Sequence, residues 1–287
     1  MSELRILVID GNRAATREAQ VAAGGSPSGE GYVKVLEALG AVLCDVVRPA
    51  DGEVHITDPR GIAGYDGVAM TGSALNVYEG GVHIERQIDL ARAVFAAGVP
   101  FFGSCWGLQV AVTAAGGRVR PNPRGREFGF ARRIELSDLG ARHAMFTGKP
   151  PVFEAITVHR DDITELPEGA RVLASSDMGV QAIELRSGRG TFWGVQYHPE
   201  YSFAEIAATA LRYGATLIDE GLFTDRAELE GFVADLRALQ GNPRHRRLTW
   251  KHGLGPALQD ESVKLAELRN WLSLQVAPYA RRHGAAP

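Results

Sequence analysis

Cysteine is scarce in this sequence, which has only Cys44 and Cys105 among its 287 residues. Neither belongs to a CxxC pair or to a cluster with histidines, so the sequence has no disulfide framework and no zinc motif. Cys44 lies inside the alternating apolar run AVLCDVV, where we expect a buried thiol that packs as a small hydrophobic group. We expect neither a bound metal nor a cofactor.

Long apolar runs are also missing, and none approaches the roughly 20 residues that a membrane-spanning helix needs. The start, MSELRILVID, leads directly into a strand pattern and has no features of a secretory signal. We therefore expect a soluble, cytoplasmic protein that does not bind membranes. The net charge of -3 argues against broad nucleic-acid binding, because that affinity comes mainly from Lys and Arg that neutralise phosphates. We interpret RHRR at 244–247 as a solvated linker.

The order of apolar runs predicts an α/β fold with a mostly parallel central sheet flanked by helices, because alternating strands and helices favour that arrangement. Strand patterns occur at 5–10, 41–47, 67–71 and 99–103, and helix patterns near 31–39 and 82–97. From about residue 128, closely spaced strand candidates predict a small antiparallel patch joined to the same sheet. Residues 22–31, AAGGSPSGEG, are too rich in Gly, Ser and Pro for regular structure, so we expect a mobile loop.

Helix patterns dominate the final part of the chain. We therefore predict one domain at 1–222 and a helical C-terminal extension at 223–287. The extension is either a docking surface or a cover for an exposed face of the sheet. Trp250 and Trp271 have helix-like spacing, which favours core packing over docking.

The stretch GSCWGLQ (103–109) places Cys105 between glycines, directly after an apolar run. GSCWG fits the small-x-nucleophile-x-small pattern of a nucleophile elbow, a tight strand-to-helix turn. Such a turn raises the thiol above the carboxyl edge of the sheet, at a helix N-terminus that favours the thiolate. A GxCxG pentapeptide around a packing cysteine also occurs by chance, so this motif alone leaves both interpretations open.

A second motif lies at the end of the β-patterned run TFWGVQYHPE. In an extended backbone, the side chains of His198 and Glu200 emerge on the same side. Glu200 can then accept the Nδ1–H of His198, which leaves Nε2 free to take a proton from a thiol. A lone histidine at a strand end would more often be structural, but its coincidence with a cysteine elbow favours a catalytic triad.

A third motif, MTGSALNVYE (70–79), is a strand end that runs into a Gly/Ser turn. Acyl transfer needs backbone N–H donors where negative charge develops on the tetrahedral intermediate, and a turn with little side-chain bulk can present one. Without the other two motifs, an ordinary loop would be the preferred interpretation.

Together, GSCWGLQ, VQYHPE and MTGSALNVYE resemble the class I, triad-type glutamine amidotransferases, particularly the glutaminase domain of GMP synthetases and its free-standing relatives. The resemblance runs from residue 4 to about 220 and includes REFGFARRIEL (126–136) and VHRDDITELPEGARVLASS (158–176). It implies a flavodoxin-like sheet. It also implies hydrolysis of the side-chain amide of glutamine, or of a related γ-glutamyl amide, through a thioester.

Carried over by position, the resemblance implies that Cys105 is the nucleophile, His198 the acid and base, and Glu200 the group that orients the imidazole. The oxyanion hole would use the backbone N–H groups of Ser73 and Trp106. The family usually has Gly-Gly-Pro in that loop, whereas this chain has Gly-Ser-Ala. Serine adopts glycine-only backbone angles only at a cost, which puts the first donor in doubt.

The same resemblance assigns Gly72 and Gln109 to substrate binding. His159 and Asp161 match a segment that lies near the partner domain in relatives. They are either a secondary functional pair or a surface hydrogen-bonded pair.

The sequence leaves the fate of the ammonia open. We expect no complete GMP synthetase, because the chain has no SGGxDS pyrophosphate loop and too few residues after position 220 for an ATP-dependent domain. We expect the ammonia to pass to a separate synthetase subunit, and the alternative is a stand-alone γ-glutamyl amide or peptide hydrolase. The oligomeric state, including a homo-oligomer, is also open.

Two other classes fit less well. A cysteine α/β-hydrolase would order its triad as nucleophile, acid and histidine, whereas the order here is Cys, His, Glu. An inactive regulatory module is less favoured because all three triad side chains are present.

Overall fold

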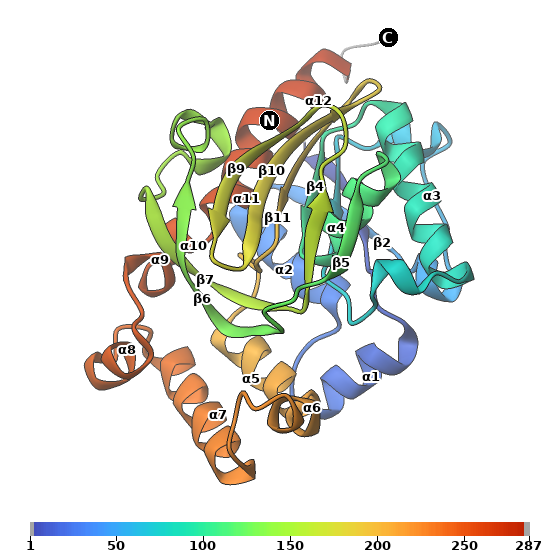
Figure 1. Cartoon of the computed structure of the whole chain (residues 1–287). Helices are drawn as coiled ribbons and strands as arrows, with labels where there is room; N and C mark the ends of the chain where they lie inside the picture. Colours follow the sequence, from blue (N-terminus) through green and yellow to red (C-terminus); the bar gives the residue numbers. More distant parts are fainter. Residues whose placement is uncertain (1–2, 284–287) are drawn as a thin grey trace.

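Four strand patterns in the first half of the chain, joined by β11 from the second half, form the parallel part of a nine-stranded sheet, ordered β2-β1-β3-β4-β11-β10-β9-β6-β7 (Figure 1). The computed structural model describes residues 3–283. Five neighbouring strands are parallel: β2 (Val42–Val47), β1 (Leu4–Ile9), β3 (Gly67–Met70), β4 (Phe101–Ser104) and β11 (Gly190–Val195). The predicted α/β class, with helices on both sides of a central sheet, is confirmed.

The antiparallel strands continue the same sheet beyond β11, as the spacing after residue 128 predicts. They are β10 (Gly179–Ser187), β9 (Ala170–Ser176), β6 (Glu127–Leu136) and β7 (Val152–His159). A separate two-stranded sheet pairs β5 (Arg118–Pro121) with β8 (Asp161–Glu165). The strands on one side of β11 are therefore parallel to it, and those on the other side form antiparallel pairs.

The predicted loop at 22–31 is wrong in its extent. Helix α1 (Ala14–Ala22), which the sequence pattern did not reveal, ends where that loop was expected to begin, and α2 (Ser28–Leu39) starts inside it. Gly29 explains the difference, because its N–H donates to Asp10 Oδ2 at 3.0 Å and a Cβ there would meet Val46 Cγ1 at 2.9 Å. The glycine that suggested irregular backbone instead lets α2 pack closely against the sheet.

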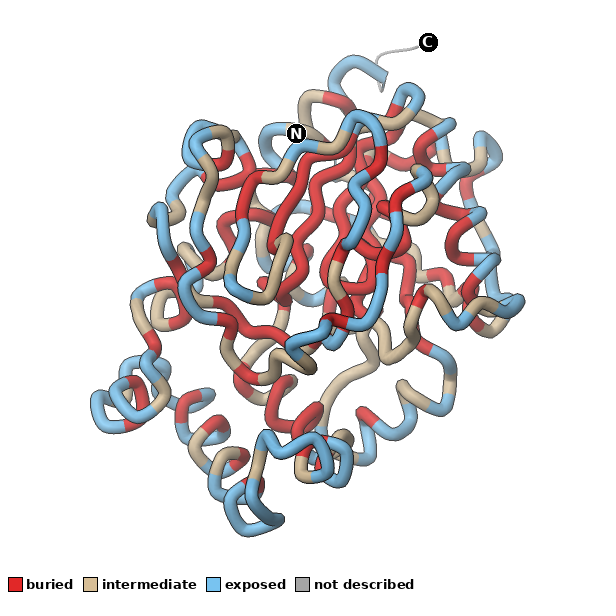
Figure 2. Tube along the Cα trace, viewed as in Figure 1, coloured by how far each residue is buried: buried red, intermediate tan, exposed pale blue. Residues whose placement is uncertain are grey.

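Helices cover both faces of the sheet, and Figure 2 shows that burial is greatest along the central strands. On one face, α3 (Val82–Ala97) and α4 (Trp106–Ala114) pack in an apolar cluster that includes Phe101 and Leu108. On the other face, a cluster that includes Tyr32, Phe102 and Trp271 joins α2 to the end of the chain. No helix within residues 3–283 is long and apolar enough to cross a membrane.

The chain after β11 is helical. The elements are α5 (Phe203–Arg212), α6 (Gly214–Asp219), α7 (Arg226–Gly241), α8 (Arg246–His252), α9 (Pro256–Gln259), α10 (Glu261–Lys264), α11 (Ala266–Trp271), a π-helical turn (Leu272–Val276) and α12 (Ala277–His283). In Figure 1, α7 and α8 lie away from the sheet, whereas α11 and α12 pass behind it. The division at 222/223 stays a prediction, and its outer ends, 1–2 and 284–287, lie outside the described residues.

Three expectations, for two single residues and one short segment, need correction. Trp271 is fully buried, as expected, but Trp250 is 81% exposed, so its predicted core packing is wrong. The predicted linker at 244–247 is wrong in its second half, because α8 begins at Arg246. Cys44 is only half-buried, since β2 is an edge strand with a neighbour on one side.

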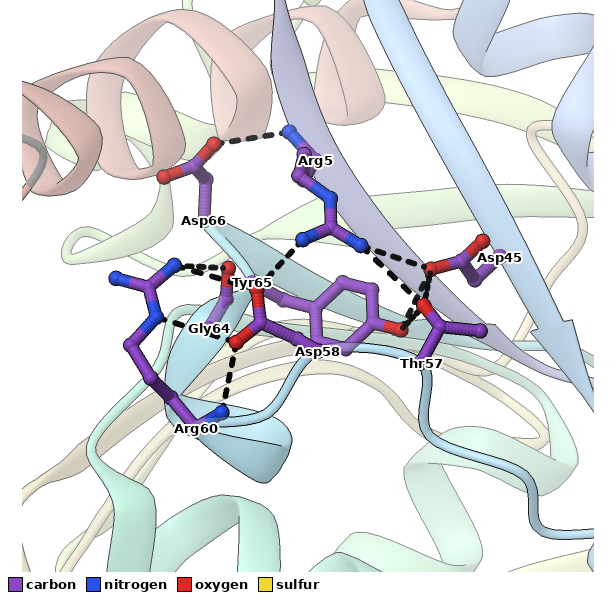
Figure 3. A network of polar contacts seen from close by, with 8 residues as sticks. All are labelled: Arg5, Asp45, Thr57, Asp58, Arg60, Gly64, Tyr65 and Asp66. Atoms are coloured by element: carbon purple, nitrogen blue, oxygen red, sulfur yellow. Dashed lines mark hydrogen bonds and ion pairs between the residues drawn. The ribbon is translucent and has the colours of Figure 1, made fainter.

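A polar network joins the first three strands at their amino-terminal side (Figure 3). Arg5 donates to Asp58 at 2.5 Å and to Asp45 at 3.2 Å, while its backbone N–H donates to Asp66. Arg60 binds the same Asp58 carboxylate, and these hydrogen bonds hold the pKa of Asp58 below its ordinary value. The network anchors the connection between β2 and β3 to the edge of the sheet opposite the strand ends that carry the candidate site.

We expect Asp58→Asn to lower the free energy of unfolding by about 2 kcal/mol at pH 7, because two arginines lose a charged acceptor. The depressed pKa means that the carboxylate contributes its stability above the ordinary pKa of about 3.9 and loses it as the pH falls. The difference in the free energy of unfolding between Asp58→Asn and the natural chain should therefore become smaller toward pH 3. Urea unfolding at both pH values measures this. Asp89→Asn, which removes an exposed i,i+3 pair with Arg92, is the control, and an equal loss in that variant would contradict the prediction.

Candidate active site

Three neighbouring strands bring the three sequence motifs to one edge of the sheet. In the order β3-β4-β11, Gly103 pairs with Met70 on one side and Ser104 with Val195 on the other. The residues that follow these pairs begin the loops at the carboxyl ends of the strands. The Cys105 N–H donates to Val195 O at 2.7 Å, which ties the elbow directly to the strand that leads to His198. Carboxyl ends of parallel strands are where α/β proteins form ligand sites.

Cys105 occupies a strained turn between β4 and α4. Its φ is 51° and its ψ is -101°, and within residues 3–283 the only other non-glycine residue with positive φ is Arg133. The glycines on either side are needed for space. A Cβ at Gly103 would lie 2.6 Å from Gly107 C, and one at Gly107 would lie 2.5 Å from Met70 O. Backbone strain of this kind persists where the surrounding structure holds it, often at functional sites.

His198 and Glu200 form a buried pair on the loop after β11. Their side chains are 2% and 3% exposed, and His198 Nδ1 lies 2.7 Å from Glu200 Oε1. Because a carboxylate only accepts, Nδ1 carries the proton. Ser104 Oγ donates to the second oxygen of Glu200 at 3.0 Å, and the Tyr32 hydroxyl lies 3.0 Å from Ser104 Oγ. Glu200 is therefore held by hydrogen bonds at both oxygens.

The second ring nitrogen of His198 is the one available for proton transfer. Within residues 3–283, Nε2 is buried and has no hydrogen bond of its own. Burial opposes the charged imidazolium, but the charge of Glu200 and the side chain of Cys105 outweigh it and raise the pKa of His198 to about 10. Cys105, whose sulfur lies 3.6 Å from Val158 O, is 4% exposed as a residue. Cys105 and His198 thus lie at the same buried edge of the sheet.

The imidazole of His198 is also fixed by packing. It stacks on Tyr201 with ring centroids 4.0 Å apart and an interplanar angle of 23°. On Gly72, which the resemblance assigns to substrate binding, a Cβ would overlap His198 Cε1. The structure places Gly72 directly against the imidazole, so this position requires glycine for packing.

The loop after β3 is held by side chains of the first strand–helix connection. Ser73 Oγ donates to Gly11 O at 2.9 Å, and Ala74 N donates to Asn12 Oδ1 at 3.0 Å. Ser73 has no positive φ, so the strain that the sequence suggested for a serine here does not arise. In the described part of the chain, the N–H groups of Ser73 and Trp106 make no hydrogen bond. Both are available as oxyanion donors.

A cavity of about 90 Å³ opens beside the sulfur. It brings together most of the predicted site residues, and its walls are Ser73, Ala74, Leu75, Asn76, Cys105, Gln109, Arg126, Val158, His159, Arg160, Asp161 and Tyr213. Gln109 is held by its Nε2, which donates to Gln196 Oε1 at 3.2 Å. Four predicted site residues do not line the cavity: Gly72, Trp106, His198 and Glu200.

His159 and Asp161 both line the cavity, but their side chains do not bind each other. The imidazole lies 3.0 Å from Glu127 Oε2 and 3.0 Å from the Asp161 carbonyl oxygen. The Asp161 carboxylate accepts from the Tyr78 hydroxyl at 3.0 Å. Burial raises the pKa of Asp161 despite this hydrogen bond and the nearby cations.

Sequence reasoning missed several residues of this site. Ser104 lies inside the elbow motif and Gln196 inside VQYHPE, so both were visible in motifs that were interpreted only at other positions. Tyr32 and Tyr213 had no local signal. They reach the site from α2 and from the break between α5 and α6, and only the tertiary fold brings them there.

The family model described as glutamine amidotransferase class-I matches residues 32–214. The chain belongs to the class I glutamine amidotransferase family. This amidotransferase is 34% identical to a gamma-glutamyl-L-1-hydroxyisopropylamide hydrolase of a Pseudomonas species, over 98% of this chain and 96% of the relative. It is an amide-hydrolysing enzyme.

Other relatives match only in part. The GMP synthase of Streptomyces coelicolor is 32% identical over 62% of this amidotransferase, which spans about a third (32%) of that relative's length. A glutamine amidotransferase structure from Thermotoga maritima has a TM-score of 0.64 at 18% identity, covering 96% of this chain and 99% of that one. One from Methylobacillus flagellatus has a TM-score of 0.60 at 19% identity, covering 98% and 95%. These structures show the fold.

Proposed function

We propose that this amidotransferase hydrolyses γ-glutamyl amides by itself, through a thioester on Cys105. The observation that carries the proposal is the buried Cys105, His198 and Glu200 group beside a cavity at the sheet edge. Similarity to a γ-glutamyl amide hydrolase over nearly the whole chain supports a stand-alone enzyme. Similarity to GMP synthases over part of the chain supports a second candidate, a glutaminase subunit that passes ammonia to a separate synthetase.

The proposed chemistry has two halves. Because the pKa of His198 is about 10, the imidazolium already holds the thiol proton on Nε2, so Cys105 attacks the γ-carbonyl carbon as the thiolate, and that proton then goes to the leaving amine as the C–N bond breaks. The N–H groups of Ser73 and Trp106 stabilise the negative oxygen of the tetrahedral intermediate. Water then attacks the thioester with the now neutral His198 as base, which releases glutamate and restores the thiolate and the imidazolium. Glu200 holds the imidazole in the required tautomer throughout.

The cavity walls fit a γ-glutamyl group, which carries an ammonium and a carboxylate at its far end. Asp161 offers an anionic side chain for the ammonium. Arg126 and Arg160 offer cationic side chains for the carboxylate, with Arg126 oriented by Glu220 at 2.7 Å. Gln109 lies beside Cys105 on the same wall and is assigned to the amide itself. In this proposal His159 supports the wall through Glu127.

An assay of the isolated protein against glutamine, γ-glutamyl alkylamides and γ-glutamyl dipeptides tests the proposal. Glutamate release from the alkylamides without any partner supports the stand-alone hydrolase. Silence with every substrate would contradict it, and activity on glutamine that appears only when a synthetase is added would favour the second candidate. The α-glutamyl isomers are the matched control, because they place the carboxylate and ammonium in the wrong position for the same walls.

We expect a diazo-ketone analogue of glutamine to label Cys105 and leave Cys44 unmodified. Burial and the nearby charges of Glu37 and Asp45 raise the pKa of Cys44 to about 12, so this thiol stays protonated at neutral pH and reacts slowly. Cys105 has a base within reach and a cavity for the analogue. Peptide mass spectrometry after stoichiometric labelling measures the site. Modification of Cys44 in preference to Cys105 would reverse the assignment.

A further inference from the structure

The end of the chain contacts the acid–base loop from behind. Residues 197–201 carry His198 and Glu200, and the tyrosines at both ends of this loop bind side chains of residues 264–267. The family model ends at residue 214, so these contacts come from outside the matched part of the chain. We propose that Glu267 and Lys264 are positioning residues that hold the His198–Glu200 pair in register with Cys105. This inference rests on the function proposed above.

Glu267 holds the first tyrosine. The Tyr197 hydroxyl donates to Glu267 Oε1 at 2.5 Å, and both residues are completely buried. Lys149 completes the contact, with its Nζ 2.9 Å from the same carboxylate and a side chain that is 2% exposed. A carboxylate this deep is stable only with a charged partner, and the pair fixes one direction for the tyrosine hydroxyl. The side chain of the residue directly before His198 is therefore fixed by a buried ion pair.

Lys264 holds the second tyrosine. Its ammonium donates to the Tyr201 carbonyl oxygen at 3.0 Å, and the ring of Tyr201 is the one that stacks on His198. Burial lowers the pKa of Lys264, while the charges of Glu261 and Glu200 oppose that shift. The end of the loop is thus fixed by a cation that comes from α10.

The same segment also packs beneath the nucleophile strand. Trp271, at the end of α11, is fully buried against Phe102 of β4, with ring centroids 5.8 Å apart. Asn270 donates to the carbonyl oxygens of Met145 and Thr147, both at 2.9 Å, which locks α11 to the body of the protein. One short stretch of chain therefore supports both the strand before Cys105 and the loop with His198. Their relative position is the quantity on which proton transfer depends.

Two conservative variants test the inference. Tyr197→Phe removes one hydroxyl and leaves the Lys149–Glu267 pair intact, and Lys264→Met keeps most of the side-chain packing while it removes the ammonium. We expect each to lower kcat for a γ-glutamyl amide about tenfold with KM unchanged within about twofold, because the imidazole moves while the cavity does not. Lys264→Arg should recover most of the loss. Arg281→Met, at an exposed position of α12, is the control and should keep the natural kcat.

A second measurement separates this inference from the proposed function. The rate of Cys105 alkylation by iodoacetamide needs no substrate, and we expect it to fall about fivefold in Tyr197→Phe and Lys264→Met because the thiol loses its aligned base. Folded variants with natural kcat and natural alkylation rate would overturn the inference. A loss of kcat that merely follows a lower folded fraction in thermal unfolding would overturn it too. Failure of the natural protein to hydrolyse any γ-glutamyl amide would overturn the proposed function, while the alkylation rates would still test the positioning.

Discussion

Replacement of Cys105 by serine is expected to lower kcat for γ-glutamyl amide hydrolysis at least about a thousandfold. The elbow holds this side chain at a strained φ of 51° beside the cavity, and no other thiol lines that wall. A serine hydroxyl fits the same space, but it is far less acidic than a thiol and the site offers only His198 to deprotonate it. The fold should therefore survive while the thioester pathway is lost.

Steady-state glutamate release by Cys105→Ser and by Cys105→Ala measures this loss. Cys44→Ser is the matched control, since Cys44 is half-buried on the edge strand β2 and makes no contact with the cavity. Thermal unfolding of all three variants shows whether the fold persists. Turnover by a folded Cys105→Ala protein at the natural rate would remove the proposed mechanism.

Gly72→Ala is expected to lower kcat about a hundredfold, the second largest effect. A Cβ at position 72 would overlap Cε1 of His198, and the imidazole has no free direction because Tyr201 stacks on it and Glu200 holds Nδ1. The ring must move, and a displacement of about 1 Å of a catalytic group costs on the order of a hundredfold in rate. Most of the measured change should be in kcat, and little of it in KM.

Gly231→Ala is the control for this substitution. Gly231 lies in α7, and a Cβ there has no heavy atom within 4 Å. That variant should keep the natural activity and gain about 0.5 to 1 kcal/mol of stability, because alanine favours a helix over glycine. If Gly72→Ala hydrolysed γ-glutamyl amides as fast as Gly231→Ala, the tight contact between Gly72 and the imidazole would not limit catalysis.

The local patterns predicted most of the fold and much of the site. The strand runs that precede Cys105 and His198 appear as β4 and β11, and the helix that follows GSCWG appears as α4. These predictions succeed because the alternation of apolar residues and the spacing of glycines are patterns that extend over only a few residues. The loop at 22–31 failed because composition alone cannot show that Gly29 faces a strand. The prediction that Trp250 packs in the core failed for a similar reason, because helical spacing does not show which face of a helix has a neighbour.

By itself, the sequence determined which chemical groups this enzyme has and the local geometry around them: the elbow at Cys105, the extended corner at His198 and Glu200, and the alternation of strands and helices that predicts a parallel sheet. Only the tertiary structure decided that β3, β4 and β11 lie side by side, that Tyr32 and Ser104 support Glu200, and that Glu267 and Lys264 reach the acid–base loop. The physical reason is separation along the chain. Contacts between residues about 70 positions apart, such as Tyr197 with Glu267, form only when the whole sheet and its helices are packed, and no local pattern encodes them.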